Sequence, residues 1–392
     1  MRAVILLVSF YGALSQPVEN EVLKEFVNGN HKFTAAVYKE ILKNEKGNFI
    51  ASPFSVETVL ALTNEGAKGD TSSELITGLS LPKTKDNIQK FFKTFLPKLK
   101  KSDEELKILS ANKIYVKEGV KLENDFKSIA TSIYNSGVSD VDFKNKVEAA
   151  ETINNWVEDN TNHKIKNLID PDTLDKDTSM ILVNALYFSG KWASEFQSYS
   201  TYKKKFFKTK DETVDIDTMY QSEYLSYYEN PALNTKFLKL DYRGADVSMT
   251  FVLPNAVDGL ATLEENVEQL LVTQPLIKAI IEVEIPKFVT ETSIKFKPIL
   301  QDLGIQKLFT DEADLTGLSS SDKNLLVSDV VQKAFINVTE TGTEAAAATA
   351  VHIIPVSLPP PPEYSFKADH PFLYFIKYND IVLFVGRYSI PS

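Results

Sequence analysis

The sequence predicts a single α+β domain, in which helices come first and strands follow. Its first third spaces apolar residues three and four apart, which is the pattern of a helix with one apolar face. Its middle and last parts contain unbroken apolar runs that are typical of buried strands. No internal repeat and no Gly/Ser-rich linker divides the 392 residues, so we expect one domain rather than two.

The N-terminal residues have the three parts of a secretory signal peptide. Arg2 supplies a positive charge, residues 3–10 are apolar, and Ala13-Leu14-Ser15 is a small-x-small cleavage site. The apolar part is too short to span a bilayer as a helix. We therefore expect residues 1–15 to be removed, residues 16–392 to form the domain, and the protein to be secreted into extracellular fluid. The alternative is that this segment is a buried N-terminal helix.

Two segments of the first third are predicted to be helices. Residues 31–42 place apolar residues four apart, from Phe33 to Ile41. Residues 88–99 repeat this pattern, and Pro97 is a residue type that breaks helices near their ends.

Later segments are predicted to be strands because they are rich in β-branched and aromatic residues. These segments are 180–188, 247–253, 280–285 and 372–385. Within the last of them, residues 373–378 and 381–385 are nearly all apolar, so we expect these strands to be buried on both faces.

The composition excludes several classes of protein. The formal net charge of −10 argues against a dedicated nucleic-acid-binding protein. No stretch after the N-terminal segment is long and apolar enough to span a membrane. The chain has no cysteine, so a secreted form must be held together by a large core alone, and no disulfide prevents a large rearrangement.

The sequence also lacks the common signatures of a hydrolase or a metalloenzyme. It contains no G-x-S-x-G nucleophile elbow and no H-E-x-x-H zinc motif. Its four histidines are His31, His163, His352 and His370. We therefore predict neither catalytic residues nor a metal site, and no cofactor is required.

Six blocks of the sequence, in family order, resemble the serpin family. They are NFIASPFS at 48–55, GAKGDT at 66–71, LVNALYFSGKW at 182–192, ADLTG at 313–317, the segment 340–349, and DHPFLYF to FVGR at 369–387. The resemblance covers essentially the whole mature chain. It implies the serpin fold, with three β-sheets called A, B and C, eight to nine helices, and an exposed reactive-centre loop, here at about 340–363.

The resemblance implies an inhibitor of serine proteases and not an enzyme. In serpins a protease cleaves the loop, and the severed loop inserts into sheet A as a new strand and traps the acyl-enzyme. The chain looks similar to insect haemolymph serpins that restrain immune protease cascades. We expect a monomer whose partner is the target serine protease, with no nucleic-acid or membrane partner.

The reactive bond follows from the family's count of seventeen residues, starting at the hinge glutamate. With Glu340 as that glutamate, the cleaved bond is Val356–Ser357. No Lys or Arg occurs between residues 344 and 366, so a trypsin-like pocket would find no cation there. Val356 suits the small apolar pocket of an elastase-like protease. The neighbouring residues that we expect to set specificity are Ile353, Ile354, Pro355 and Leu358.

Insertion of the loop requires small residues on the face that enters the sheet. Strand alternation places small or β-branched residues on that face. The predicted hinge consists of Glu340, Gly342, Thr343, Ala345, Ala347 and Thr349. The alternative is an alanine-rich helix, which would indicate a non-inhibitory serpin that acts as a carrier, a storage protein or a glycosaminoglycan-binding protein.

The resemblance also implies residues that support the opening of the sheet. Ser52, Ser55 and Asn184 would belong to the hydrogen-bonded shutter beneath it. Lys287 would pair with Glu340, and Trp192 would lie at the breach, where insertion begins.

One shutter position departs from the family pattern. Gln332 stands where many serpins have a histidine. Because a glutamine side chain both donates and accepts hydrogen bonds, it can replace that histidine in a closed shutter but cannot give it a pH dependence.

Two groups of lysines form candidate binding sites for heparin or another glycosaminoglycan, which could act as an activator. The first group is Lys90, Lys93, Lys98, Lys100 and Lys101, where the heparin-activated serpins bind glycosaminoglycan. The second group includes Lys203, Lys204 and Lys205. The alternative is that both groups are ordinary solvated faces, balanced by nearby acidic residues.

Overall fold

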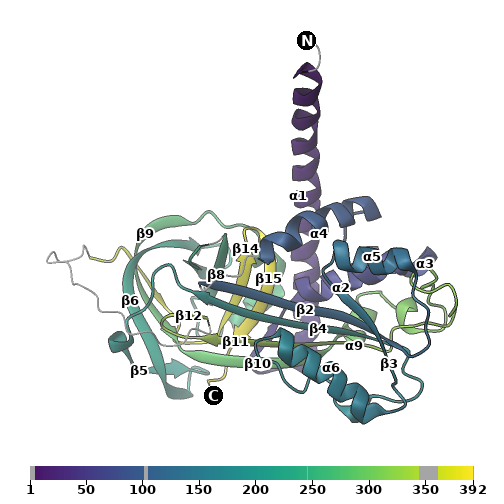
Figure 1. Cartoon of the computed structure of the whole chain (residues 1–392). Helices are drawn as coiled ribbons and strands as arrows, with labels where there is room; N and C mark the ends of the chain where they lie inside the picture. The colour runs from purple at the N-terminus through teal and green to yellow at the C-terminus, as the bar shows by residue number, and fades with distance from the viewer. Residues whose placement is uncertain (1–4, 101–104, 245, 344–360, 392) are drawn as a thin grey trace.

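The computed structural model describes residues 5–100, 105–244, 246–343 and 361–391. These residues form nine α-helices and two β-sheets (Figure 1). The helices are α1 (Ile5–Asn44), α2 (Pro53–Gly66), α3 (Gly69–Gly78), α4 (Lys85–Leu99), α5 (Asn124–Ser132), α6 (Lys146–Asn160), α7 (Leu260–Glu265), α8 (Val267–Leu271) and α9 (Phe296–Asp302). None of the described helices is long and apolar enough to cross a membrane.

The smaller sheet has six strands, and its order is β10-β11-β12-β4-β2-β3. The strands are β2 (Leu106–Lys117), β3 (Gly137–Val141), β4 (Met180–Lys191), β10 (Phe288–Lys295), β11 (Asp329–Val338) and β12 (Gly342–Thr343). Strands β11 and β4 are parallel and pair directly from Asp329↔Ile181 to Phe335↔Tyr187. Beyond that point β12 lies between them and pairs with both. The two central strands are therefore already separated at one end.

The larger sheet has nine strands, ordered β1-β15-β14-β8-β7-β6-β9-β13, with β5 also paired to β6. They are β1 (Phe49–Ala51), β5 (Thr201–Phe207), β6 (Thr213–Asn230), β7 (Thr235–Asp241), β8 (Val247–Pro254), β9 (Ile277–Pro286), β13 (Tyr364–Lys367), β14 (Phe372–Tyr378) and β15 (Ile381–Tyr388). The long strand β6 pairs with β5, β9 and β7 in turn. It thus joins two smaller sheets into one, so the three expected sheets appear as two hydrogen-bonded units.

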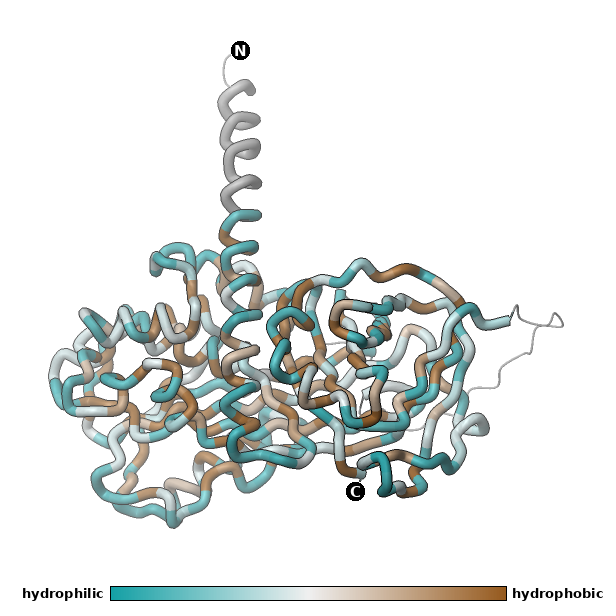
Figure 2. The backbone as a smooth tube through the Cα atoms, turned by 180° about the vertical axis from the view of Figure 1, so that it is seen from behind, coloured by the Kyte–Doolittle hydropathy of each residue, from teal (hydrophilic) through white to brown (hydrophobic). Residues whose placement is uncertain are grey.

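The main core lies between the two sheets and the helices packed on them. Helix α2 contacts strands of both sheets and is buried over nearly its whole length. Its start is fixed by Ser52, whose side chain accepts a hydrogen bond from the Ser55 N–H, and by Pro53 in the first turn. Figure 2 shows the apolar strand segments at the centre of the molecule and hydrophilic segments mainly at its outer turns.

A second core covers the opposite face of the six-stranded sheet. Ile153 and Val157 of α6 pack there with Val183 of β4 and Tyr115 of β2. Figure 1 shows α6 lying across these strands. The six-stranded sheet is therefore covered on both faces where α6 lies, which explains the unbroken apolar sequence of β4.

The predicted strands are present, and β14 and β15 are buried almost throughout, as expected. The two apolar runs are separated by a turn in which Asn379 has a positive φ of 50°. The two predicted helices lie within α1 and α4. Helix α4 continues through Pro97 to Leu99, so Pro97 is in the last turn rather than at the boundary.

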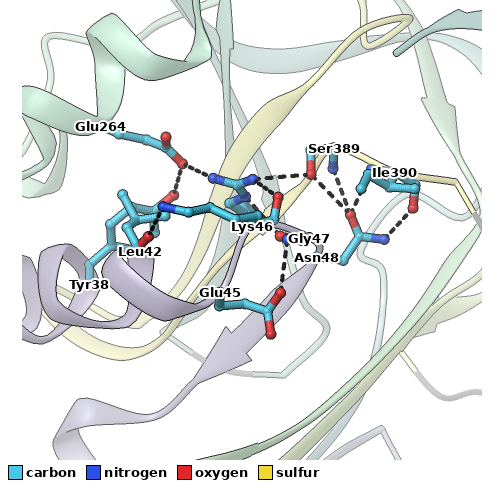
Figure 3. A network of polar contacts seen from close by, with 10 residues as sticks. Tyr38, Leu42, Glu45, Lys46, Gly47, Asn48, Glu264, Ser389 and Ile390 are labelled. Carbon is cyan, nitrogen blue, oxygen red and sulfur yellow. Dashed lines mark hydrogen bonds and ion pairs between the residues drawn. The ribbon is translucent and has the colours of Figure 1, made fainter. Parts of the chain in front are cut away.

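A network of polar contacts ties the C-terminal strand to the end of α1 (Figure 3). The Arg387 guanidinium donates to Glu264 Oε1 at 2.9 Å and to the Gly47 carbonyl at 2.8 Å. Tyr38 also donates to Glu264 Oε1, at 2.9 Å. The Asn48 side chain accepts from the Ser389 and Ile390 N–H groups, at 2.7 and 2.9 Å. The contacts of Gly47 and Asn48 join segments that are more than 300 residues apart in the chain.

Candidate reactive-loop hinge and its supporting network

The chain reverses direction between β11 and β12 in a tight turn. The Thr339 N–H donates to the Gly342 carbonyl at 2.8 Å, and the Gly342 N–H donates back to Thr339 at 3.3 Å. Gly342 approaches the neighbouring strand so closely that a Cβ atom would lie 2.0 Å from the Gly190 carbonyl oxygen. Only glycine fits this position, and it lets Thr343 enter the space between β11 and β4.

Glu340, in this turn, is held by two side chains and by backbone. Lys287 Nζ lies 3.0 Å from its carboxylate oxygens, and the Thr201 hydroxyl donates to Oε1 at 2.8 Å. The Phe196 N–H donates to the Glu340 carbonyl at 2.9 Å. Burial alone would raise the pKa of Glu340, but hydrogen bonds from its own N–H, Lys287 and Thr201 lower it overall. The structure therefore brings together the predicted pair Lys287 and Glu340.

Trp192 lies directly beneath the turn. Its indole N–H donates to the Thr339 carbonyl at 3.0 Å, and its backbone N–H donates to Thr341 at 3.0 Å. The Tyr242 ring stacks on the Trp192 ring at a centroid distance of 4.5 Å. Trp192 is 1% exposed, so this stack forms the buried floor of the hinge.

The predicted shutter residues form one buried network where β11 and β4 are still paired. The Asn184 Nδ2 donates to Ser55 Oγ and to Asn112 Oδ1, both at 2.5 Å. The Ser52 hydroxyl donates to the Leu383 carbonyl at 2.6 Å. The network therefore connects α2, β2, β4 and β15.

Gln332 completes this network from β11. Its Oε1 accepts from the Ser52 N–H at 2.8 Å, and its Nε2 donates to the Ser52 carbonyl at 2.8 Å and to Asn184 Oδ1 at 2.6 Å. It is fully buried. The glutamine thus uses both its donor and its acceptor capacity, as its chemistry predicts.

The two lysine groups differ in their surroundings. In the second group, Lys203 pairs with Asp217 at 3.1 Å, Lys204 pairs with the buried Glu284, and Lys205 faces Asp215 across the strand pair β5–β6. In the first group, Lys100 donates to Asn135 at 2.8 Å. Lys90, Lys93 and Lys98 of α4 form no ion pair with any described residue. Among the described residues, three lysines of the first group thus lack an ion pair, whereas in the second group only Lys205 lacks one, and it faces Asp215 on the neighbouring strand.

Several predicted residues lie outside the described part of the chain. They are Lys101 of the first lysine group, Ala345, Ala347 and Thr349 of the hinge, and Ile353, Ile354, Pro355, Val356, Ser357 and Leu358 around the predicted reactive bond.

Sequence reasoning missed three residues of the site. Asn112 joins the shutter, Thr201 binds Glu340, and Tyr242 stacks on Trp192. Asn112 could have been recognised, since it is a polar residue inside a strand-like run. No local pattern points to Thr201 or Tyr242, because their partners are distant in the sequence.

Comparisons with known proteins agree with this architecture. The family model described as serpin (serine protease inhibitor) matches residues 28–391. Alaserpin of Manduca sexta is 36% identical over 99% of this chain and 100% of its own length. Antichymotrypsin-2 of Bombyx mori is 36% identical over 92% of this chain and 96% of its own length.

A solved structure gives the same result. The structure of Serpin48, a highly specific serpin of the insect Tenebrio molitor, is 41% identical and superposes with a TM-score of 0.88. The match covers 94% of this chain and 99% of that one. With the sheet, the hinge and the shutter described above, these matches lead to one conclusion: the chain belongs to the serpin family.

Proposed function

We propose that the protein is a secreted suicide-substrate inhibitor of serine proteases, cleaved near Val356–Ser357. The observation that carries the proposal is the position of β12. Thr343 is already paired with both Val338 of β11 and Gly190 of β4. The first step of strand insertion is thus present before cleavage.

The register of β12 supports insertion of the following residues. If both ladders continue, residue 345 falls opposite Ile336 and Phe188, and residue 347 falls opposite Ala334 and Leu186. All four partners are almost fully buried. The inserting face must therefore be narrow, and Ala345 and Ala347 meet this requirement.

The same register places Thr349 opposite both Gln332 and Asn184. These two side chains now bond to each other at 2.6 Å. An inserting strand would separate them and leave buried amide groups without partners, which is costly. The Thr349 hydroxyl can donate and accept, so it offers both amides a replacement.

Trapping then depends on whether the loop inserts faster than water hydrolyses the acyl ester. The protease serine attacks the Val356 carbonyl, the bond to the Ser357 nitrogen breaks, and an acyl ester forms. Water would release the protease by hydrolysing this ester. Insertion of the residues that follow Thr343 pulls the ester out of the geometry that hydrolysis requires, before water attacks it. The native state is in this sense kinetically stable.

The target class follows from the loop sequence. The loop offers no cation between residues 344 and 366, and Val356 fits a small apolar pocket, so the proposed target is elastase-like. The direct test is incubation with an elastase-like protease. We expect a complex of summed mass that survives SDS, with cleavage between Val356 and Ser357 by mass spectrometry. Quantitative cleavage without a complex would instead support the non-inhibitory alternative.

A matched pair of variants tests the insertion step. Ala347→Arg places a charge on the face that enters the core, so we expect the variant to be cleaved without trapping the protease. Glu344→Arg places the same charge on the opposite face, opposite Asn337, and should trap normally. Equal trapping by both variants would contradict the register.

Secretion is proposed from residues 1–15. Sequencing of the protein recovered from culture medium should begin at about residue 16. Retention of the full N-terminus in the medium would contradict cleavage at this site.

A second candidate function is glycosaminoglycan binding by α4, because Lys90, Lys93 and Lys98 are unpaired among the described residues. The triple alanine variant should elute from heparin at lower salt. Lys203→Ala with Lys205→Ala should elute as the parent does, since these lysines face Asp217 and Asp215. Equal effects from both sets would mean that retention reflects overall charge alone.

A further inference from the structure

Thr343 has a single hydrogen-bond partner for its side chain among the described residues. Its Oγ1 lies 2.6 Å from the Tyr242 hydroxyl, and either oxygen can be the donor. Thr343 is completely buried and Tyr242 is 2% exposed. Water therefore cannot replace either partner without opening the site.

Tyr242 is held rigidly in place. Its ring lies on Trp192 and meets the edge of Phe188 at 4.9 Å. Its backbone N–H donates to Val247, and Tyr242 forms an isolated bridge with Trp192. At Gly190 a Cβ atom would lie 2.8 Å from Cδ1 of the Tyr242 ring, so glycine is needed there. These contacts fix the rotamer of Tyr242, so its hydroxyl points toward Thr343.

We propose that Tyr242 is a positioning residue for loop insertion: its hydroxyl holds Thr343 between β11 and β4 before the loop is cleaved. This inference rests on the proposed inhibitory function and adds the residue that fixes where insertion starts. Once the loop is cut, insertion continues from a strand that is already open at β12. Tyr242 thereby influences whether the protease is trapped or released.

The chemistry of the pair predicts how variants behave. Removing one hydroxyl leaves the other buried without a good partner, because the remaining neighbour of Tyr242 is Met249 Sδ at 3.6 Å. Thr343 is then displaced more often from its position between β11 and β4. Replacing both groups by apolar ones of similar shape leaves no orphan and costs little. The two single changes should therefore not be additive.

The first experiment measures insertion after cleavage by an elastase-like protease. The chain has two tryptophans, Trp156 and Trp192, so Trp156→Phe leaves Trp192 as a reporter at the hinge. After cleavage, the fluorescence of Trp192 should change about tenfold more slowly in Tyr242→Phe and in Thr343→Val than in the parent. Each variant should also consume more inhibitor molecules per protease trapped. Thr343→Ser keeps the hydroxyl and should be close to the parent. The double variant Tyr242→Phe/Thr343→Val should recover most of the loss.

The control is Tyr227→Phe, which removes a different hydroxyl, bonded to Glu229 at 2.6 Å on the nine-stranded sheet. It should change neither the rate nor the stoichiometry. An unchanged rate in Tyr242→Phe, or a double variant with the sum of both losses, would overturn the proposal.

The second experiment separates this inference from the proposed function. Hydrogen exchange of the Gly342 and Thr343 amides is measured in the uncleaved chain, with no protease present. Both single variants should lose protection there. Lost protection in a chain that never traps a protease would refute inhibition and support the Tyr242 contact. Normal trapping with unchanged protection in both variants would refute the Tyr242 contact and leave inhibition standing.

Discussion

Gln332 connects the two central strands to the helix beneath them through three hydrogen bonds, two to Ser52 and one to Asn184. It lies where β11 and β4 are still paired. Under the proposed mechanism, its hydrogen bonds would have to break before the sheet could open further than it does at β12. No group in this side chain titrates between pH 5 and 8, in contrast to a histidine.

Gln332→Ala should lower the free energy of the first unfolding transition by about 2–4 kcal/mol, since it leaves the Ser52 backbone and Asn184 without partners in a buried site. The urea midpoint of the uncleaved protein measures this loss. The matched control is Gln221→Ala on β6, because the Gln221 Nε2 makes no hydrogen bond with any residue that the structure describes. A similar loss in both variants would show that the network does not hold the strands.

Glu340 gives the hinge a pH dependence of a defined sign. Its pKa in the folded protein is below the ordinary value of 4.5. Its contribution to stability is then fully present above that value and is lost as the pH falls through the folded pKa. Glu340→Gln should remove this part of the acid dependence below about pH 4.5 and leave the dependence between pH 5 and 8 as it is.

The measurement is the difference in unfolding midpoint between Glu340→Gln and the parent as a function of pH. We expect Glu340→Gln to cost about 1 kcal/mol near pH 7, because Lys287 is partly exposed. That cost should shrink as the pH falls below 4.5. A cost that grows toward acid pH would mean that Glu340 is stabilised in its protonated form.

At this scale the resemblance to the family identified the shutter residues and the pair of Lys287 and Glu340, but not every residue that contacts them. Ser52, Ser55 and Asn184 do meet in the structure, and Lys287 does meet Glu340. Asn112 and Tyr242 were missed because a hydrogen bond or a ring contact between distant segments depends on strand register. Register is set by the whole sheet and is not visible in a local pattern.

At the scale of elements, β15 is fixed to the rest of the molecule by a buried ion pair. The side chains of Arg387 and Glu264 are 11% and 10% exposed, and Arg387 NH1 lies 2.9 Å from Glu264 Oε1. Arg387 also holds the carbonyls of Lys46 and Gly47, just before β1. These contacts therefore fix the end of β15 to the segment just before β1.

Arg387→Ala should destabilise the protein by about 3–5 kcal/mol, because it leaves the Glu264 carboxylate buried without its cation. The double variant Arg387→Met/Glu264→Leu should lose less. Lys146→Ala, which breaks an exposed pair with Asp172, should change the stability little, because solvent screens that pair. Chemical unfolding of all three variants checks the order, and an equal loss in Arg387→Ala and Lys146→Ala would contradict it.

The predicted elements could be recognised because their periodicity is local. The helices α1 and α4 and the strands β4, β8, β9, β14 and β15 contain the segments that the pattern indicated. The end of α4 was less clear, since Pro97 in a last turn lacks only an N–H and the helix continues to Leu99. The short strand β12 could not be predicted, because two residues are too few to show an alternation of apolar and polar side chains. Its position also depends on the separation of β11 and β4.

At the scale of the whole molecule, the chain combines a large core with a sheet that is open at one end. It has no cysteine, so nothing covalent links β11 to β4. The main core involves both sheets and most of the described helices. Under the proposed mechanism, this core would hold the native form while the six-stranded sheet accepts another strand. The lack of cysteine and the position of β12 thus both favour the proposed insertion.

Cleavage within residues 344–360 should therefore raise the thermal stability of the whole protein. Under the proposed mechanism, insertion would add hydrogen bonds to both β11 and β4 and would bury the side chains that follow Thr343. We expect the melting temperature to rise by on the order of 20 °C relative to the intact chain. Scanning calorimetry of intact and cleaved protein measures this shift. Ala347→Arg is the control, because a charge on the inserting face should keep the cleaved form near the intact melting temperature, and a full shift in this variant would place the stabilisation outside the six-stranded sheet.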